Sequence, residues 1–391
     1  MRNSPKNPPS KPDTDDEPDL FRALELAHYA ERFRGKVFAL ALAPGTPFAN
    51  PLVDLKVLAG YRIQVVLVAP DADSRLQALI SRSNKRGSRF HLLQAARADS
   101  GAAPPAVGRG LAQRIAKALK QQKTPVIACR SGSVDGCGVS APFLLGAEVA
   151  ERLRADKLFL TGPRMGGLIA TFPRSHVMAE EIAAAGRQLP ATERKRSAPL
   201  LAFVFECLKR GLPDIVLIED RPGRLFREVF THEGSGVLFN NVVGELVRQA
   251  RLEDVTDIAL LLRTGIEEGR ILPVDENDIE REIHRIWVYE IDGLVVGCAR
   301  LKAHGDWAEL AQFVTLPRYR GKGHARTLGI RLEEEAAAMG IRTLFALSIH
   351  GSMGRLFTEQ GFRPVDRGAL PREWQAGYDM KRPSRAYIKE L

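Results

Sequence analysis

Five short, almost entirely apolar runs between Lys36 and Asn240 set narrow limits on the fold of this chain. They lie at residues 37–42, 63–68, 125–128, 157–160 and 215–218. Segments with helical spacing of apolar residues lie among them, at 111–119, 147–153 and 200–208. Strands without polar alternation are typical of sheets that are covered on both faces. The alternation of such strands with helices predicts a parallel, three-layer α/β sandwich.

The pattern changes after Asn240 and indicates an α+β domain. We expect helices at 253–264, 276–283 and 325–339, and strands at 286–291, 294–301, 307–316 and 343–348. Asp292-Gly293 predicts a hairpin between the first two strands. A Pro-rich, acidic N-terminal stretch has too few apolar residues to bury. We therefore expect a disordered tail at 1–18, a first domain at 19–244 and a second at 245–391.

The composition allows several partners and disfavours others. The net charge of +10 is compatible with nucleic acid, an anionic membrane or a small polyanionic ligand. However, no nucleic-acid-binding signature is present, and the longest apolar run is far shorter than the ~18 residues of a membrane span. The four cysteines are scattered without a C-x-x-C pair, so we expect no metal, no disulfide framework and a cytoplasmic location.

The segment Pro317–Ala325 follows a predicted strand and opens a predicted helix. Glycines allow close approach of the backbone, and free amides at a helix start bind anions such as a pyrophosphate. The residues that we expect to contact the anion are Arg320, Gly321, Lys322, Gly323, His324 and Ala325. The alternative is a basic surface turn without a ligand.

Arg320-x-x-Gly323-x-Ala325 resembles the R-x-x-G-x-G/A signature of the GNAT acyl-CoA acetyltransferases, and Gln360-Gly361-Phe362 resembles the end of a later motif of that family. The resemblance implies acetyl-CoA as co-substrate and direct attack of an amine on its thioester. It also implies that the strand before the loop splays from its neighbour, so that its amides, including those of Phe313 and Val314, contact the pantetheine arm.

Two residues are candidates for the proton transfers of such a reaction. Glu309 lies where a carboxylate could accept the proton of the ammonium group, directly or through water; the alternative is a strand-end surface glutamate. The family often uses a tyrosine to protonate the leaving thiolate, but Leu356-Phe357 stands there. Ser348 or water would then take that role.

The N-terminal half resembles the amino-acid kinases. Ala155–Thr161 is similar to a strand of that fold, and the segment from Glu228 to Gly236 is similar to its ending. A kinase-like domain followed by a GNAT domain is the architecture of the N-acetylglutamate synthases, whose C-terminal pattern the chain also resembles. The resemblance implies acetyl transfer to the α-amino group of L-glutamate, the first step of arginine biosynthesis.

The same resemblance implies that Lys302, Arg382 and Ser384 bind the carboxylates of the acceptor. An arginine that the synthases carry after an Ile-Leu pair is missing here, where Pro273-Val274-Asp275 follows Ile271-Leu272. Acetylation of another amine, another amino acid or a protein lysine, therefore stays open.

The kinase half has lost the residues that its own chemistry needs. Ala41 replaces the lysine, and Ala43-Pro44 replaces the glycine pair of the first phosphate loop. We therefore expect no kinase activity. The resemblance instead implies an L-arginine effector site with Tyr29, Glu233 and Gly236, and we expect a homo-oligomer. A non-enzymatic amino-acid sensor is the third possibility.

Overall fold

The computed structural model describes residues 17–70, 74–95, 107–129, 139–172, 174–241, 244–291, 293–349 and 351–391. The chain divides into two compact units. Unit 1 combines the residues up to 173 with Ile182–Leu238, and unit 2 combines Arg174–Glu181 with Phe239–Leu391. The expected tail lies almost wholly outside the described residues.

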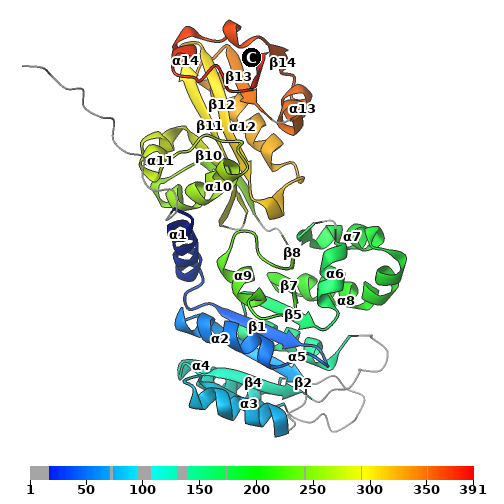
Figure 1. Ribbon diagram of the computed structural model, residues 1–391. Helices are drawn as coiled ribbons and strands as arrows, with labels where there is room; N and C mark the ends of the chain where they lie inside the picture. Colours follow the sequence, from blue (N-terminus) through cyan, green and yellow to red (C-terminus); the bar gives the residue numbers. More distant parts are fainter. Residues whose placement is uncertain are drawn as a thin grey trace, which may run out of the picture. The chain divides into compact units, whose positions relative to one another are not determined.

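The first sheet has eight strands in the order β3, β4, β2, β1, β5, β7, β8 and β6 (Figure 1). The six strands from β3 to β7 in this order belong to unit 1, β6 (His176–Met178) belongs to unit 2, and β8 contains the passage from one unit to the other. Their bounds are β1 Val37–Leu42, β2 Gln64–Pro70, β3 Phe90–Gln94, β4 Thr124–Cys129, β5 Lys157–Gly162, β7 Asp214–Glu219 and β8 Val237–Asn240. The registers of β1 with β2 and β5, of β4 with β2 and β3, and of β5 with β7 are all parallel. Residues such as Phe38, Leu40 and Phe159 are fully buried, as expected for strands covered on both faces.

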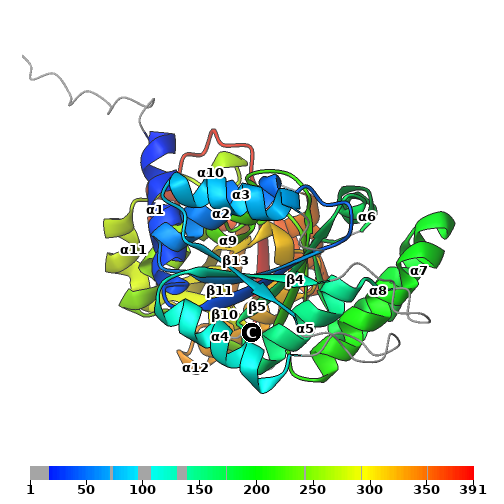
Figure 2. The ribbon, with the colours of Figure 1, turned by 90° about the horizontal axis from the view of Figure 1, so that it is seen from below.

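Helices cover both faces of this sheet, with α2 and α3 on one side and α4 and α5 on the other (Figure 2). The helices are α1 Glu17–Arg32, α2 Ala49–Gly60, α3 Ser74–Lys85, α4 Arg109–Lys120, α5 Ala141–Leu153, α6 Met165–Thr171, α7 Ile182–Gln188, α8 Ala191–Lys209 and α9 Arg224–Phe230. The expected three-layer α/β sandwich is therefore present. Its sequence-predicted strands are confirmed, whereas β3 and β8 escaped prediction.

Unit 2 contains a seven-stranded sheet in the order β14, β15, β13, β12, β11, β10 and β9. The strands are β9 Glu245–Gln249, β10 Ile286–Ile291, β11 Leu294–His304, β12 Trp307–Thr315, β13 Thr343–Ser348, β14 Arg363–Val365 and β15 Arg385–Glu390. Its helices are α10 Val255–Glu267, α11 Glu276–Glu282, α12 His324–Ala338, α13 Gly351–Glu359 and α14 Arg372–Ala376. Only the β12–β13 pair is parallel among the registers of these described strands.

Arg174–Glu181 belongs to unit 2 although the chain on both sides of it belongs to unit 1. This segment contains β6 (His176–Met178) and a single 3-10 turn, η1 (Ala179–Glu181). The chain passes into unit 2 again between Leu238 and Phe239, six residues before the expected boundary after residue 244. Asn240, just after this passage, contacts the same segment, because its Oδ1 lies 2.8 Å from Nε2 of His176.

Candidate active site

The strands β12 and β13 pair only over the first part of their length. The parallel register runs from Trp307↔Thr343 to Leu310↔Ala346, although both strands continue beyond it. On its other side β12 has a register shift against β11, and Gln312 adopts a left-handed backbone with φ 56°. Such a bulge re-aims the backbone and occurs next to active sites. Phe313 and Val314, the two residues predicted to contact the pantetheine arm, lie on β12 beyond the end of this register with β13, and Val314 is buried.

The predicted phosphate loop follows directly after β12. It contains the 3-10 turn η4 (Pro317–Tyr319), then Gly321 with φ 76° and Gly323 with φ 90°, and leads into the 15-residue helix α12. Both glycines adopt a left-handed backbone that favours glycine. The first amides of α12 have no intrahelical partner, so this loop presents donors to an anion.

Arg320 and Lys322, two of the cations of the loop, are engaged with carboxylates. Arg320 forms a fork with Glu268, with Nη1–Oε1 and Nη2–Oε2 distances of 3.0 and 3.4 Å, and its Nε donates to the carbonyl of Thr315. Nζ of Lys322 donates to Oε2 of Glu181 at 3.1 Å, and the Lys322 side chain is only 3% exposed. Arg320 is thus placed at the loop surface, whereas the Lys322 ammonium points inward.

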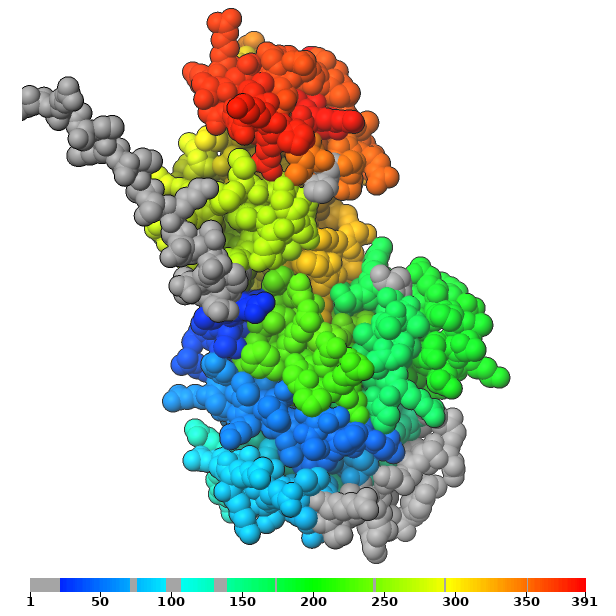
Figure 3. Space-filling model, viewed as in Figure 1, coloured from blue at the N-terminus to red at the C-terminus, as the bar shows by residue number. Residues whose placement is uncertain are grey.

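A cavity of about 430 Å³ lies beside the opening between β12 and β13. It brings together five of the residues predicted from the sequence: Lys302, Glu309, Ser348, Arg382 and Ser384. They come from β11, β12 and β13 and from the segment before β15. Figure 3 shows the C-terminal part of unit 2, to which this segment belongs, as an orange to red surface. The site residues predicted from separate motifs therefore converge on one cavity.

Both oxygens of the Glu309 carboxylate accept hydrogen bonds. Nε1 of Trp374 donates to Oε1 at 3.0 Å, and Nη2 of Arg300 donates to Oε2 at 3.1 Å. Glu309 is only 8% exposed. A carboxylate accepts at about four lone-pair positions, so Glu309 retains the capacity to bind a water or an ammonium group.

Several lining residues were not predicted from the sequence, namely Arg270, Arg300, His304, Trp374 and Tyr378. With Lys302 and Arg382, Arg270 and Arg300 bring four cations to the cavity, against the carboxylates of Glu309 and Glu373. Arg270 directly precedes the Ile-Leu pair, so it supplies a guanidinium close to where the expected arginine is missing. Burial lowers the pKa of His304.

The carboxylate-binding candidates are held in place by neighbours. Nη2 of Arg382 donates to the carbonyl of Arg270 at 3.0 Å, and Oγ of Ser384 lies 2.9 Å from the hydroxyl of Tyr378. Nζ of Lys302 lies 3.4 Å from a carboxylate oxygen of Glu282. That carboxylate also accepts from Arg300, and its pKa is lowered because these cations outweigh its desolvation.

The three predicted effector residues lie in unit 1. Tyr29 of α1 is buried and stacks on Phe33 with ring centroids 6.2 Å apart. Glu233 is half exposed and pairs with Arg227 of α9. A Cβ on Gly236 would lie 2.1 Å from the carbonyl oxygen of Leu217, so close packing alone requires glycine there.

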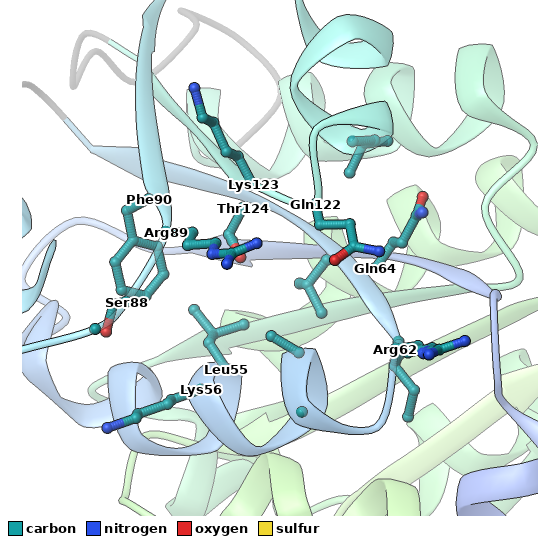
Figure 4. A pocket seen from close by; sticks show the side chains of 16 residues that line it. Leu55, Lys56, Arg62, Gln64, Ser88, Arg89, Phe90, Gln122, Lys123 and Thr124 are labelled. Atoms are coloured by element: carbon teal, nitrogen blue, oxygen red, sulfur yellow. The ribbon is translucent and has the colours of Figure 1, made fainter.

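Unit 1 also contains a cavity of about 390 Å³ at the amino ends of β2, β3 and β4. Figure 4 shows its four cationic side chains, Lys56, Arg62, Arg89 and Lys123. The cavity also receives the ends of α2 and α4, and cations are favourable at helix C-termini. The lining contains no carboxylate among the described residues, so this cavity has no counterpart to Glu309 of the unit 2 cavity.

Comparisons with known proteins agree with this geometry. Residues 252–362 match the model of the Acetyltransferase (GNAT) family. Unit 2 contains a GNAT domain. Two curated relatives are amino-acid acetyltransferases, from Vibrio cholerae serotype O1 (30% identical over 260 residues) and Azotobacter vinelandii (32% over 244 residues). The matched regions cover 63% and 61% of this chain and 57% and 55% of the relatives, so the chain spans little more than half the length of each.

A solved structure supports the order of the two folds. The N-acetylglutamate synthase of Neisseria gonorrhoeae, complexed with coenzyme A and L-arginine, aligns over 95% of this chain and 99% of its own length, with a TM-score of 0.54 and 20% identity. The expected fold class, a kinase-like α/β sandwich followed by a GNAT domain, is confirmed. Within the described ranges, no helix is both long and apolar enough to cross a membrane.

Proposed function

We propose that this chain is an amino-acid N-acetyltransferase that transfers acetyl from acetyl-CoA to the α-amino group of L-glutamate. The observation that carries this proposal is the opening between β12 and β13. The cation-lined cavity lies beside this opening, and β12 leads directly into the phosphate loop. A GNAT domain and two amino-acid acetyltransferase relatives support the reaction class.

Acetyl-CoA would bind along the loop and the opened strand. The amides at the start of α12 would bind the pyrophosphate, with Arg320 beside them. The pantetheine arm would pair with the edge of β12 at Phe313 and Val314. This places the thioester carbonyl near the bulge at Gln312, where a fixed backbone N–H can stabilise the oxyanion that develops during attack.

The acceptor would bind in the cavity through its two carboxylates. Arg382, Ser384 and Lys302 are the proposed ligands, and Arg270 takes the place of the missing arginine. Three of the four cations already contact carboxylates of the protein, Glu268, Glu282 and Glu309, and a dicarboxylate acceptor could share them. A protein lysine brings no carboxylate to this cation-lined cavity, so its lining favours glutamate over a protein lysine as acceptor.

Glu309 would accept the proton of the substrate ammonium group, directly or through a water. The free amine then attacks the thioester carbon to form a C–N bond, and the collapse of the tetrahedral intermediate breaks the C–S bond. The thiolate leaves with the electron pair of that bond. The second proton of the attacking nitrogen passes to this thiolate, with the hydroxyl of Ser348 in the same cavity as the proposed donor that is reprotonated from the nitrogen, so that the products are the amide and the free thiol.

A panel of amines tests this function with acetyl-CoA and the release of free thiol as the signal. We expect turnover with glutamate, and much less with glutamine, aspartate and a lysine peptide. Arg382→Ala should raise the acceptor KM by about tenfold to a hundredfold, which corresponds to the loss of a charged hydrogen bond. Arg331→Ala, on an exposed face of α12, is the control. Turnover of another amine but not of glutamate would overturn the acceptor assignment.

L-arginine is the proposed effector of unit 1, on the basis of Tyr29, Glu233 and the synthase fold. Adding it to the active assay should change the rate or the thermal stability. An unchanged rate together with an unchanged midpoint of thermal unfolding would contradict the effector proposal but would leave the proposed reaction class untouched.

A further inference from the structure

Arg174–Glu181, here called the brace segment, contacts three residues of the phosphate loop within unit 2. The ring of His176 lies 4.6 Å from that of Tyr319. Nη2 of Arg174 donates to the carbonyl of Gly321 at 3.3 Å, and Oε2 of Glu181 accepts from Nζ of Lys322 at 3.1 Å. The contacts thus follow one side of the loop from its 3-10 turn toward α12.

We propose that the brace segment positions the phosphate loop for acetyl-CoA, with Glu181 and Lys322 as its central pair. The proposal rests on the proposed function for the identity of the ligand. Under this proposal Lys322 has a different role from the one expected from the sequence, in which its side chain contacts the pyrophosphate. Here its ammonium holds the loop to the brace segment, and the loop amides bind the anion.

The burial of Lys322 is the first argument. Its side chain is 3% exposed, and Glu181 is its carboxylate partner. Burial lowers the pKa of Lys322, and the contact with Glu181 acts in the opposite direction. An ammonium that is buried in this way cannot also reach a solvent-accessible diphosphate. Removing its partner would leave an uncompensated charge, so the loop would move to bring Lys322 back to water.

The geometry of the peptide bond is the second argument. A trans peptide is planar, so the carbonyl of Gly321 and the N–H of Lys322 point in opposite directions. Arg174 binds that carbonyl from the side of the brace segment. The N–H of Lys322 is therefore held on the opposite side of the loop, away from the brace segment. A loop with fixed amides binds an anion more tightly than one that must first be ordered.

The brace segment is itself fixed by internal contacts. Oε2 of Glu181 also accepts from the N–H of Met178 at 3.0 Å, and Nη1 of Arg174 lies 3.7 Å from Oε1 of Glu181. Desolvation raises the pKa of Glu181, but these hydrogen bonds and cations outweigh it, and the net pKa is lowered. Glu181 is therefore a charged anchor at neutral pH.

Glu181→Gln tests the proposal, and Glu180→Gln is the matched control. Glu180 is the exposed neighbour in the same segment and has no ion pair with a described residue. We expect Glu181→Gln to raise the Kd of coenzyme A and the KM of acetyl-CoA by about tenfold. kcat should change little, because the amide that polarises the thioester lies on β12. Adding Lys322→Met to Glu181→Gln should recover part of the affinity, since it removes the unpaired charge.

Trypsin cleavage after Lys322 provides a readout that does not depend on coenzyme A. We expect cleavage to be slow in the wild type and in Glu180→Gln, and faster in Glu181→Gln with an unchanged global melting temperature. Equal cleavage rates and equal Kd values for coenzyme A in all three proteins would contradict the proposal that the brace segment positions the loop. Tighter binding by Glu181→Gln would also overturn it, because Glu181 would then compete with the phosphate. If the wild type does not bind coenzyme A, the proposed function fails. The cleavage rates then still test whether the brace segment holds the loop.

Discussion

His324, the first residue of α12, lies in a site that disfavours its protonated form. It is 6% exposed and packs against the rings of Tyr289 and Tyr319. Burial lowers its pKa; among the charged groups that face it, Glu245 raises the pKa and Lys322 lowers it. Below pH 6.5 the unfolded chain takes up a proton that the folded chain does not, so the free energy of unfolding falls as the pH falls.

We therefore predict that unit 2 is less stable at pH 5.5 than at pH 7.5, and that His324→Gln reduces this difference. Each unit of pKa separation corresponds to about 1.4 kcal/mol. All three tryptophans lie in unit 2, so thermal unfolding followed by tryptophan fluorescence reports on this unit. The exposed His284→Gln is the control. An identical pH dependence in the wild type and His324→Gln would contradict the prediction.

Sequence reasoning reached some single residues and missed others for a physical reason. Lys302 and Arg382 were found because they stand in patterns similar to a known family. Trp374 and Arg300 were missed because their role is to donate hydrogen bonds to Glu309, from which they are separated by 65 and 9 residues in sequence, respectively. Such partners are set by tertiary packing, which no local pattern encodes.

Asp54 connects two helices of unit 1 that are far apart in sequence. It lies on α2 and is 2% exposed. Its Oδ1 accepts from the N–H of Gly223, and its Oδ2 accepts from the N–H groups of Leu225 and Phe226 at the start of α9. A side chain from another helix thereby satisfies donors that α9 cannot satisfy itself. Burial raises the pKa of Asp54, against these hydrogen bonds, which lower it.

We predict that Asp54→Ala destabilises unit 1 by about 1–3 kcal/mol, because it leaves buried donors without an acceptor. Asp275→Ala is the matched control, since Asp275 caps the exposed start of α11 through the N–H of Asp278. Its expected cost is smaller, about 1 kcal/mol. Circular dichroism should show an earlier transition for Asp54→Ala, and tryptophan fluorescence of unit 2 should not. Coincident shifts in both signals would contradict the assignment to unit 1.

Among the elements, continuous apolar strands were predicted well and irregular ones were not. The sequence of β1 is a continuous apolar run and predicts a buried strand, whereas β3 contains His91 and Gln94 and is too polar and too short to be predicted as a strand. The separation of β12 from its neighbour was expected from the family resemblance, but the bulge was beyond prediction, because Gln312 adopts a left-handed backbone without the usual glycine. The feature that opens the candidate site is therefore set by the sheet and not by a turn residue.

The division of the whole chain into units does not follow the order of the sequence. The brace segment belongs to unit 2, but α6 and α7, its neighbours in sequence, belong to unit 1. Glu181 and Lys322 are 141 residues apart, so no local pattern could have joined them. Both ends of this segment continue into unit 1, and its side chains contact the phosphate loop of unit 2.

The fragment 239–391 tests whether the GNAT domain is complete without the brace segment. It retains the described strands β9 to β15 and all three tryptophans. It lacks His176, which contacts Asn240 and Tyr319, and Glu181, the partner of Lys322. Exposing Tyr319 and releasing Lys322 to water should cost about 1–3 kcal/mol, since hydrogen-bond partners are lost at partly buried positions.

We predict that the fragment unfolds at a lower temperature than unit 2 does in the full chain, as measured by tryptophan fluorescence, and that it binds coenzyme A more weakly. The full chain with Glu181→Gln is the control, because it removes the central charge but keeps the rest of the brace segment. Its coenzyme A affinity should lie between those of the fragment and the full chain, and its melting temperature should stay that of the full chain. The loss of affinity should exceed that of the control because Arg174 no longer fixes the carbonyl of Gly321. A fragment with the melting temperature and coenzyme A affinity of the full chain would show that residues 239–391 order the phosphate loop alone.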